Sequence, residues 1–404
     1  MSVYSPCMKT KILSLATVLA LIVSSASADP LKVFILAGQS NMQGTAREST
    51  FDHIGMDPKT APLLKKMRDA DGKPVVLKDV WISSISAGGN DEKVGNLTFG
   101  YGAGDDRMGP EFTFGITMHE LLDEPILIIK TAWGGKSLHT DFRPPSAGKF
   151  QFNETQIANM KKQGKDLSEV QAKSDEASGH FYRLMMEHVN KVLKDIKRVY
   201  PEYNEKDGYE VAGFAWFQGW NDMVNGGYYN NRGGDGGYKA YSEVMAQFIR
   251  DVRKDLNAPE MPFVIGVLGV GGPVEKYDEV TKRRYGKIHQ NFRDAMAAPA
   301  SMDEFKGNVS AVLTENFWDH KLEELKGRGG KVKAKQKELD KDSSLSKEEK
   351  KKIIADFRAN LYTEEEKVYL TGSSNQGFHY NGCGKIFAQI GEAFAKANYE
   401  MLSK

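Results

Sequence analysis

The chain has 404 residues, a formal net charge of +1 and two cysteines. The near-zero net charge, without a stripe of basic side chains, argues against a nucleic-acid partner. A chain of this length buries a full hydrophobic core without disulfide bonds, and only Cys383 follows the N-terminal apolar run.

The N-terminus has the pattern of a secretory signal. Two lysines precede an apolar run over residues 12–24, and an Ala-Ser-Ala tripeptide ends at Ala28. This combination predicts a signal peptide, residues 1–28, that is cut after Ala28. The alternative is a membrane anchor, but a membrane span needs roughly 20 apolar residues and this run is shorter. We therefore expect the mature chain, residues 29–404, to be secreted or periplasmic, without membrane contact after signal removal.

Beyond the signal, short apolar runs alternate with longer amphipathic stretches. The runs are rich in β-branched and aromatic residues and are apolar on both faces, as in parallel strands that are covered on both sides. We expect strands at residues 31–36, 80–85, 126–131, 211–217, 263–270 and 309–314. We expect helices at residues 111–122, 180–199, 238–256, 284–297 and 385–402. The alternation predicts an α/β fold, a three-layer sandwich with a mostly parallel central sheet.

A charged segment interrupts this pattern before the last helix. Residues 319–367 are dense in Lys and Glu and contain few large apolar side chains. Ser346 and Glu349 have the spacing of a capping box, which marks the start of a helix. We interpret the segment as a solvated helical insertion in a single domain of residues 29–404.

Two motifs follow the first and third predicted strands, at the sheet edge where α/β sandwiches build their sites. In Gly-Gln-Ser-Asn-Met, Ser40 stands on a strand-to-helix turn that exposes its hydroxyl, although a helix-capping serine would look the same. The second motif contains Gly134 and Gly135, which allow a close backbone approach to a ligand. Its Gly-Lys-Ser ending is similar to a phosphate-binding loop, but Lys130 stands where that loop needs glycine, which excludes a nucleotide site.

Two further motifs follow later strands. Asn221 comes directly after the predicted strand at residues 211–217, and its amide could donate to an oxyanion or cap a turn. His379 lies in a glycine-flanked turn before the C-terminal helix, whereas His119 and His188 lie within helical patterns. His379 is therefore the candidate catalytic histidine.

Taken in order, the four motifs resemble those of the SGNH hydrolase superfamily. The form Gly-Gln-Ser-Asn-Met looks like the sialate O-acetylesterase-like branch, which includes carbohydrate esterase family 6. The resemblance covers residues 31–399 and implies a flavodoxin-like sandwich. It also implies a serine esterase that removes an acyl group, in this branch an acetyl group, from a carbohydrate through an acyl-enzyme intermediate; the signal pattern adds export.

The resemblance also implies roles for individual residues. Ser40 matches the nucleophile, and His379 matches the general base and acid. The oxyanion hole would consist of the Ser40 amide, Gly134, Gly135 and Asn221. No spacing of His, Cys or carboxylates fits a metal, so we expect neither a metal nor another cofactor.

The triad acid is missing from both of its usual positions. Many relatives carry Asp three residues before the catalytic His, where this chain has Gln376, and others carry Glu after Gln-Gly, where it has Trp220. An acid at this place fixes the imidazole tautomer and stabilises the imidazolium. We predict a Ser–His dyad, with His379 oriented by a neutral group such as Gln376 or by Asp222.

Polar and aromatic residues of the motifs are candidates for contact with an acetylated carbohydrate. These candidates are Gln39, Asn41, Glu111, Gln218 and Trp220. A non-catalytic carbohydrate-binding descendant of the same fold would also explain the missing acid, and this alternative stays open.

Overall fold

The computed structural model describes residues 1–5, 29–85 and 91–404. Most of the predicted signal peptide therefore lies outside the described residues, and its boundary at Ala28 stays a prediction, as does the single domain that would follow it. Within the described part of the chain, none of the helices combines the length and the apolar character that crossing a membrane requires.

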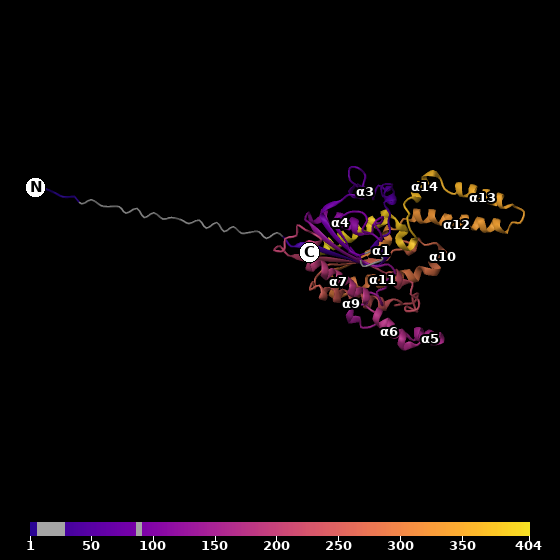
Figure 1. Ribbon diagram of the computed structural model, residues 1–404, viewed down its shortest axis with the longest axis horizontal. Helices are drawn as coiled ribbons and strands as arrows, with labels where there is room; N and C mark the ends of the chain where they lie inside the picture. The colour runs from indigo at the N-terminus through magenta and orange to yellow at the C-terminus, as the bar shows by residue number, and fades with distance from the viewer. Residues whose placement is uncertain (6–28, 86–90) are drawn as a thin grey trace.

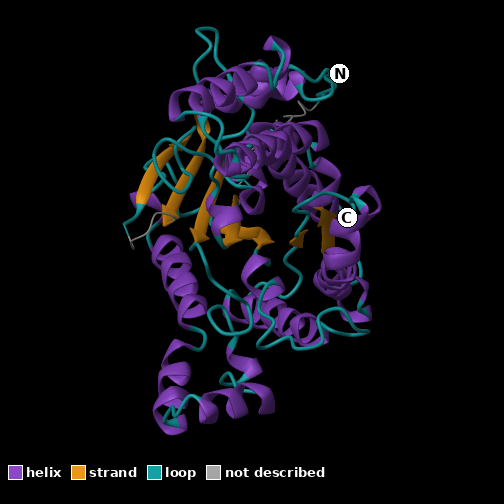
Figure 2. Ribbon diagram, turned by 90° about the vertical axis from the view of Figure 1, so that its right-hand side faces the viewer, coloured by secondary structure: helices purple, strands orange, loops and turns teal. Residues whose placement is uncertain are grey.

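A sheet of seven strands forms the centre of the described structure (Figure 2). In chain order the strands are β1 (Leu31–Gly38), β2 (Leu77–Ile85), β3 (Lys93–Leu97), β4 (Ile126–Ala132), β5 (Tyr209–Phe217), β6 (Phe263–Val267) and β7 (Val309–Leu313). Their spatial order is β3-β2-β4-β1-β5-β6-β7. The pairs are parallel except for β2 with β3, which confirms the predicted α/β fold with a mostly parallel sheet.

Helices cover both faces of the sheet (Figure 1). On one face α4 (Glu111–Leu122) packs against the C-terminal helix α15 (Gly384–Leu402). The other face carries α7 (His180–Lys194), α9 (Lys239–Asp255) and α11 (Lys287–Ala297). Because both faces are covered, every residue of β4 is buried, which explains why residues 126–129 are apolar without alternation.

The predicted elements differ from the structure where the apolar signal is weak. The strand β3 was not expected, because Lys-Val-Gly-Asn-Leu is short, largely polar and lies at the antiparallel edge of the sheet. The helices α5 (Glu154–Lys162) and α6 (Leu167–Ala177) were also missed, and Met160 is their only buried residue among those described. The helix expected over residues 180–199 ends earlier, at Lys194.

The charged segment forms three helices: α12 (His320–Lys341), α13 (Lys347–Ala359) and α14 (Glu364–Leu370). The capping box expected at Ser346 and Glu349 is formed in full. The helices α12 and α13 lie side by side and project beyond the sheet (Figure 1). Most of their residues are exposed or partly exposed.

The register of the central strands brings the motifs together. Gly38, the last residue of β1, pairs with Ala132 of β4 on one side and with Phe217 of β5 on the other. Because the three strands are parallel, the segments that follow them meet at one edge of the sheet. Gly38 is required here, since a Cβ at this position would lie 2.2 Å from the Phe217 carbonyl oxygen.

Candidate active site

Ser40 is the first residue of the short helix α1 (Ser40–Gln43), directly after β1. Its side chain is partly exposed, whereas the residues on either side are buried. Gly134 lies beside it, since a Cβ on Gly134 would be 3.7 Å from the Ser40 Cβ. Gly134 and Gly135 are both exposed, and Gly134 is the one in contact distance of Ser40.

Asn221 reaches the same place from the end of β5. It belongs to α8 (Trp220–Met223) and is partly exposed. The Gln39 side chain donates through Nε2 to Asn221 Oδ1 at 3.1 Å and to Ser40 Oγ at 3.4 Å. The structure therefore brings together the three motifs that follow β1, β4 and β5.

His379 comes from a distant part of the sequence, in the turn η9 (Gly377–Gly382). This turn is attached to the Ser40 segment, because Asn41 Nδ2 donates to the Phe378 carbonyl at 3.3 Å and Thr45 Oγ1 to the His379 carbonyl at 3.5 Å. Among the described residues, no hydrogen bond joins Ser40 to His379. Such catalytic bonds often form fully only when substrate is bound.

The imidazole of His379 is oriented by Asn375, a residue that the sequence-based reasoning missed. Asn375 Oδ1 is 3.1 Å from His379 Nδ1 and also accepts the Gln376 backbone N–H at 2.7 Å. Because the backbone N–H fixes which end of the amide is the oxygen, His379 Nδ1 must be the donor. The lone pair then lies on Nε2, where a general base needs it. The one sequence signal for this contact is the position of Asn375, four residues before His379.

Neither residue that was expected to orient His379 does so in the structure. The Gln376 side chain is exposed and, within the described chain, forms no hydrogen bond with His379. Asp222 is fully buried and binds a different histidine, with its Oδ1 2.8 Å from His139 Nδ1. The expectation is corrected to Asn375, because the turn at residues 375–379 folds back on itself.

The Asp222 carboxylate holds the site's loops together. It accepts hydrogen bonds from the Leu138 and His139 backbone N–H groups, Gln218 Nε2 and the Tyr229 hydroxyl. Burial alone would raise the pKa of Asp222, but the interactions with His139, the Leu138 N–H and Gln218 hold that pKa below its ordinary value. Asp222 thus ties the loop after β4 to α8, which carries Asn221.

Four of the five expected substrate contacts lie in the interior. Gln39, Asn41, Glu111 and Gln218 are each at most 1% exposed. Glu111 forms a buried ion pair with Lys130, whose Nζ lies 2.6 Å from Glu111 Oε2 and also donates to the Gln43 carbonyl. Burial, opposed by Lys130, raises the pKa of Glu111. These four side chains lie beneath the surface of the site. The expectation that they contact the substrate is therefore corrected.

Trp220 is the fifth expected contact, and it does lie at the surface of the site. Its ring lies 5.6 Å from that of Phe378, which is 39% exposed. The Phe378 ring is in turn 4.4 Å from the His379 imidazole. The two aromatic side chains form a partly exposed apolar wall next to His379.

The environment of His379 favours its neutral form. Burial lowers the pKa of His379 below its ordinary value, and the nearby charge of Arg107 lowers it further. Arg107 is itself paired with Asp106, at 3.4 Å. A neutral imidazole is the form that can accept a proton from a serine hydroxyl.

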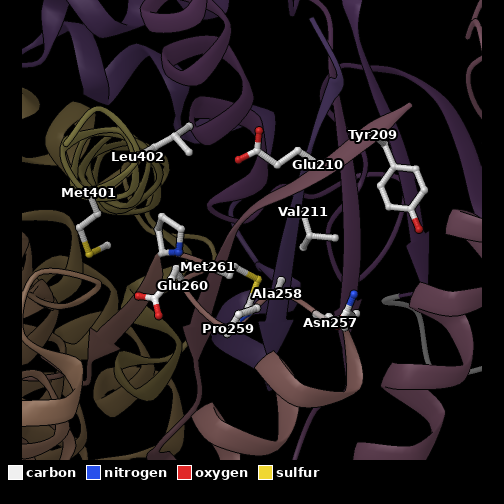
Figure 3. Close-up of a pocket in the computed structure, with 12 residues that line it drawn as sticks. Tyr209, Glu210, Val211, Asn257, Ala258, Pro259, Glu260, Met261, Met401 and Leu402 are labelled. Carbon is white, nitrogen blue, oxygen red and sulfur yellow. The ribbon is translucent and has the colours of Figure 1, made fainter. Parts of the chain in front are cut away.

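A separate hollow lies at the opposite end of the sheet (Figure 3). It is lined by the start of β5, including Tyr209 and Glu210, by residues 256–262 and by Met401 and Leu402 at the end of α15. None of the four motifs contributes to it. Among the described residues, no group of three His, Cys, Asp or Glu side chains is arranged to hold a metal ion.

The family comparison covers most of the chain. The family described as carbohydrate esterase, sialic acid-specific acetylesterase, matches residues 30–306. The chain belongs to this family. This membership confirms the predicted class of enzyme, a carboxylic ester hydrolase that acts on carbohydrate esters. The match includes Ser40, Gly134 and Asn221 but ends before His379, so the assignment of the histidine depends on the geometry described above.

Solved structures similar to this sialic acid-specific acetylesterase family member share little sequence with it. A protein from Arabidopsis thaliana has a TM-score of 0.39 and 17% identity over 70% of this chain and 85% of its own. A carbohydrate acetylesterase from Xanthomonas citri has a TM-score of 0.35 and 13% identity over 70% of this chain and 50% of its own. A search of curated proteins gives no match.

Proposed function

We propose that the chain is an exported serine esterase that removes O-acetyl groups from a carbohydrate through an acetyl-enzyme. The observation that carries this proposal is the gathering of Ser40, Gly134, Asn221 and the His379 turn at one edge of the sheet. This set supplies a nucleophile, oxyanion donors and a base, which together are the requirements of acyl transfer.

Acylation begins with proton transfer from Ser40 Oγ to His379 Nε2. The oxygen attacks the carbonyl carbon of the acetyl ester, and the carbonyl oxygen becomes an oxyanion. Asn221 Nδ2, the Ser40 amide and an amide of Gly134 or Gly135 donate to this oxyanion. The carbon–oxygen bond to the sugar then breaks, and the departing sugar oxygen takes the proton from His379.

Deacylation repeats these steps with water. His379 accepts a proton from water, whose oxygen attacks the acetyl group on Ser40. The second tetrahedral intermediate collapses, the Ser40 oxygen recovers its proton from His379, and acetate leaves. Each cycle consumes one ester and one water and releases one sugar hydroxyl, one acetate and one proton, so no redox partner or cofactor enters.

The wall formed by Trp220 and Phe378 supports a carbohydrate as the substrate. Sugar rings present apolar C–H faces that pack well against aromatic side chains, while their hydroxyl groups stay in water. The wall adjoins His379, the residue that protonates the departing oxygen. In this arrangement the sugar, as leaving group, lies against the aromatic rings and the acetyl group lies toward Asn221.

A panel of acetylated carbohydrates tests the proposal. Purified protein is incubated with acetylated xylan, O-acetylated sialic acids and other acetylated glycans, and released acetate is measured. We expect acetate from at least one of them. Binding of these glycans without acetate release would instead support the non-catalytic, carbohydrate-binding alternative.

The same proposal includes export. In the natural host, we expect the mature protein outside the cytoplasm with Asp29 as its first residue, because the Ala-Ser-Ala tripeptide precedes it. N-terminal sequencing of the protein from the culture medium or periplasm checks this. A protein that stays in the cytoplasm with residues 1–28 attached would contradict it.

Asn221→Ala is expected to lower kcat by about 10²–10³, the usual cost of one oxyanion donor. The KM should change much less, because the donor acts on charge that develops in the transition state. Steady-state kinetics on the best glycan, with the melting temperature as a control for folding, checks this. An equal loss in kcat and in substrate affinity would identify Asn221 as a sugar contact instead.

Arg107→Gln is expected to shift the acid limb of the kcat/KM profile to higher pH. The positive charge of Arg107 lowers the pKa of His379, so its removal raises that pKa and protonates the base at a higher pH. Arg47→Gln is the matched control, because Arg47 also pairs with Asp106, and its acid limb should stay in place. Identical pH profiles of kcat/KM for the wild-type protein, R107Q and R47Q would contradict an effect of the Arg107 charge on the pKa of His379.

A further inference from the structure

Gln39 lies between the nucleophile and the oxyanion donor. It precedes Ser40 in the chain, is only 1% exposed and contacts Asn221 with its side-chain amide. We propose that Gln39 is a positioning residue that holds the Asn221 amide with its NH₂ group toward the oxyanion. This inference rests on the proposed esterase function and adds a residue to it.

The direction of the Gln39 amide is fixed by two backbone donors. The N–H groups of Gly219 and Asn221 both point at Gln39 Oε1, at 3.2 and 3.4 Å. A backbone N–H cannot accept a hydrogen bond, so the atom that faces both must be the oxygen. The other end of the Gln39 amide, Nε2, is therefore a donor.

The direction of the Asn221 amide follows from that of Gln39. Gln39 Nε2 lies 3.1 Å from the Asn221 side chain, so the atom it meets must be the acceptor, Oδ1. Asn221 Nδ2 then points away from Gln39. It has no hydrogen-bond partner among the described protein residues, which leaves it free to donate to an oxyanion. A reversed Asn221 amide would present Oδ1 to the oxyanion and repel it.

A buried network behind Gln39 keeps this arrangement rigid. Gln218 Nε2 donates to Gln39 Oε1 at 3.1 Å and to Asp222 Oδ2 at 2.7 Å. Gln218 Oε1 accepts from the Tyr241 hydroxyl at 3.1 Å. Reversal of the Gln39 amide would therefore set its NH₂ group against three donors at once. The network explains why two buried glutamines stand at the end of the sheet.

The substitution Gln39→Glu isolates the donor function. A carboxylate keeps the acceptor for Gly219, Asn221 and Gln218 but has no NH₂ group for Asn221 Oδ1. The Asn221 amide is then expected to turn its Nδ2 toward the carboxylate. At pH 8–9 we expect Q39E to lower kcat by about 10², as loss of one oxyanion donor does, with a much smaller change in KM.

A double-mutant cycle separates positioning from the effect of an added charge. If Gln39 acts by orienting Asn221, Q39E should cause no further loss of kcat in the N221A background. If the new negative charge simply repels the oxyanion, the loss should be as large in N221A as in the wild-type protein, and the proposal is overturned. Unchanged kcat in Q39E would overturn it as well.

The wild-type and N221A proteins keep this test distinct from that of the esterase function. Wild-type protein that releases no acetate contradicts the proposed function. If the wild-type protein is active but Q39E lowers kcat as much in the N221A background as in the wild-type background, only the role of Gln39 is contradicted. Circular dichroism and melting temperature check folding. If Q39E does not fold, the same cycle is run with Gln39→Met, which has a similar length, no charge and no donor.

Discussion

Replacing Ser40 with alanine is expected to lower kcat for acetate release by at least about 10⁴-fold, because no other atom can form the acetyl-enzyme. Folding should not change, since the Ser40 hydroxyl accepts only one long hydrogen bond, 3.4 Å from Gln39 Nε2, within the described residues. His379→Ala should cost nearly as much. The double variant should be no worse than either single one, because nucleophile and base act as a unit.

Acetate release and mass spectrometry check this expectation. In wild-type protein quenched during turnover, the peptide that contains Ser40 should carry one acetyl group, and in S40A it should not. Ser49→Ala is the matched control, because Ser49 is an exposed serine on the nearby turn η1 (Glu48–Thr50) and should leave the rate unchanged. An S40A protein that retains a tenth of the wild-type rate would contradict Ser40 as the nucleophile.

The sequence predicted the sheet because the central strands have to be apolar on both faces. In β4 all residues are buried, so its run of apolar residues is a strong signal. The same reasoning placed Ser40, Gly134 and Asn221 at one edge, since parallel strands end together. The edge strand β3 has no such constraint, and its sequence therefore carries little information about its structure.

The partner of His379 could not be predicted because it depends on an irregular turn. Tyr380 and Asn381 both have positive φ, 50° and 61°, which side chains other than glycine rarely adopt. These two residues turn the chain back, so that the Asn381 N–H and carbonyl bond to the backbone of residues 374–376. Asn375 is thereby placed against the imidazole. The periodicity of the sequence does not predict a turn of this kind.

Asp222 shows a second limit of reasoning from motifs. It directly follows Asn221, the predicted oxyanion donor, and was therefore expected near His379. In the structure they belong to the helix α8, where successive side chains point in different directions, and Asp222 turns inward to His139 while Asn221 stays at the surface. The carboxylate that follows Asn221 in the sequence therefore stabilises the loops here.

Asn375→Ala is expected to lower kcat by about 10³-fold with a small change in KM. Without the Asn375 oxygen, His379 Nδ1 has no acceptor, and the tautomer with its proton on Nε2 gains population. That tautomer cannot accept the Ser40 proton, and a wrong tautomer costs about 10⁴ when a triad carboxylate is replaced by an amide. The effect here is smaller because the lost group is neutral and carries no charge to stabilise the imidazolium.

The substitution Asn375→Asp separates the orientation of the His379 imidazole from the effect of a negative charge beside it. A carboxylate accepts from His379 Nδ1 as the amide does and also stabilises the imidazolium, so kcat should match or exceed that of the wild-type protein. The negative charge should raise the pKa of His379, so the base becomes protonated at a higher pH and the acid limb of kcat/KM moves up. The wild-type protein, whose His379 has a lowered pKa, should then keep the larger share of its activity in mild acid. Full activity in N375A, or an acid limb in N375D that moves to lower pH, would show that Asn375 does not orient the histidine.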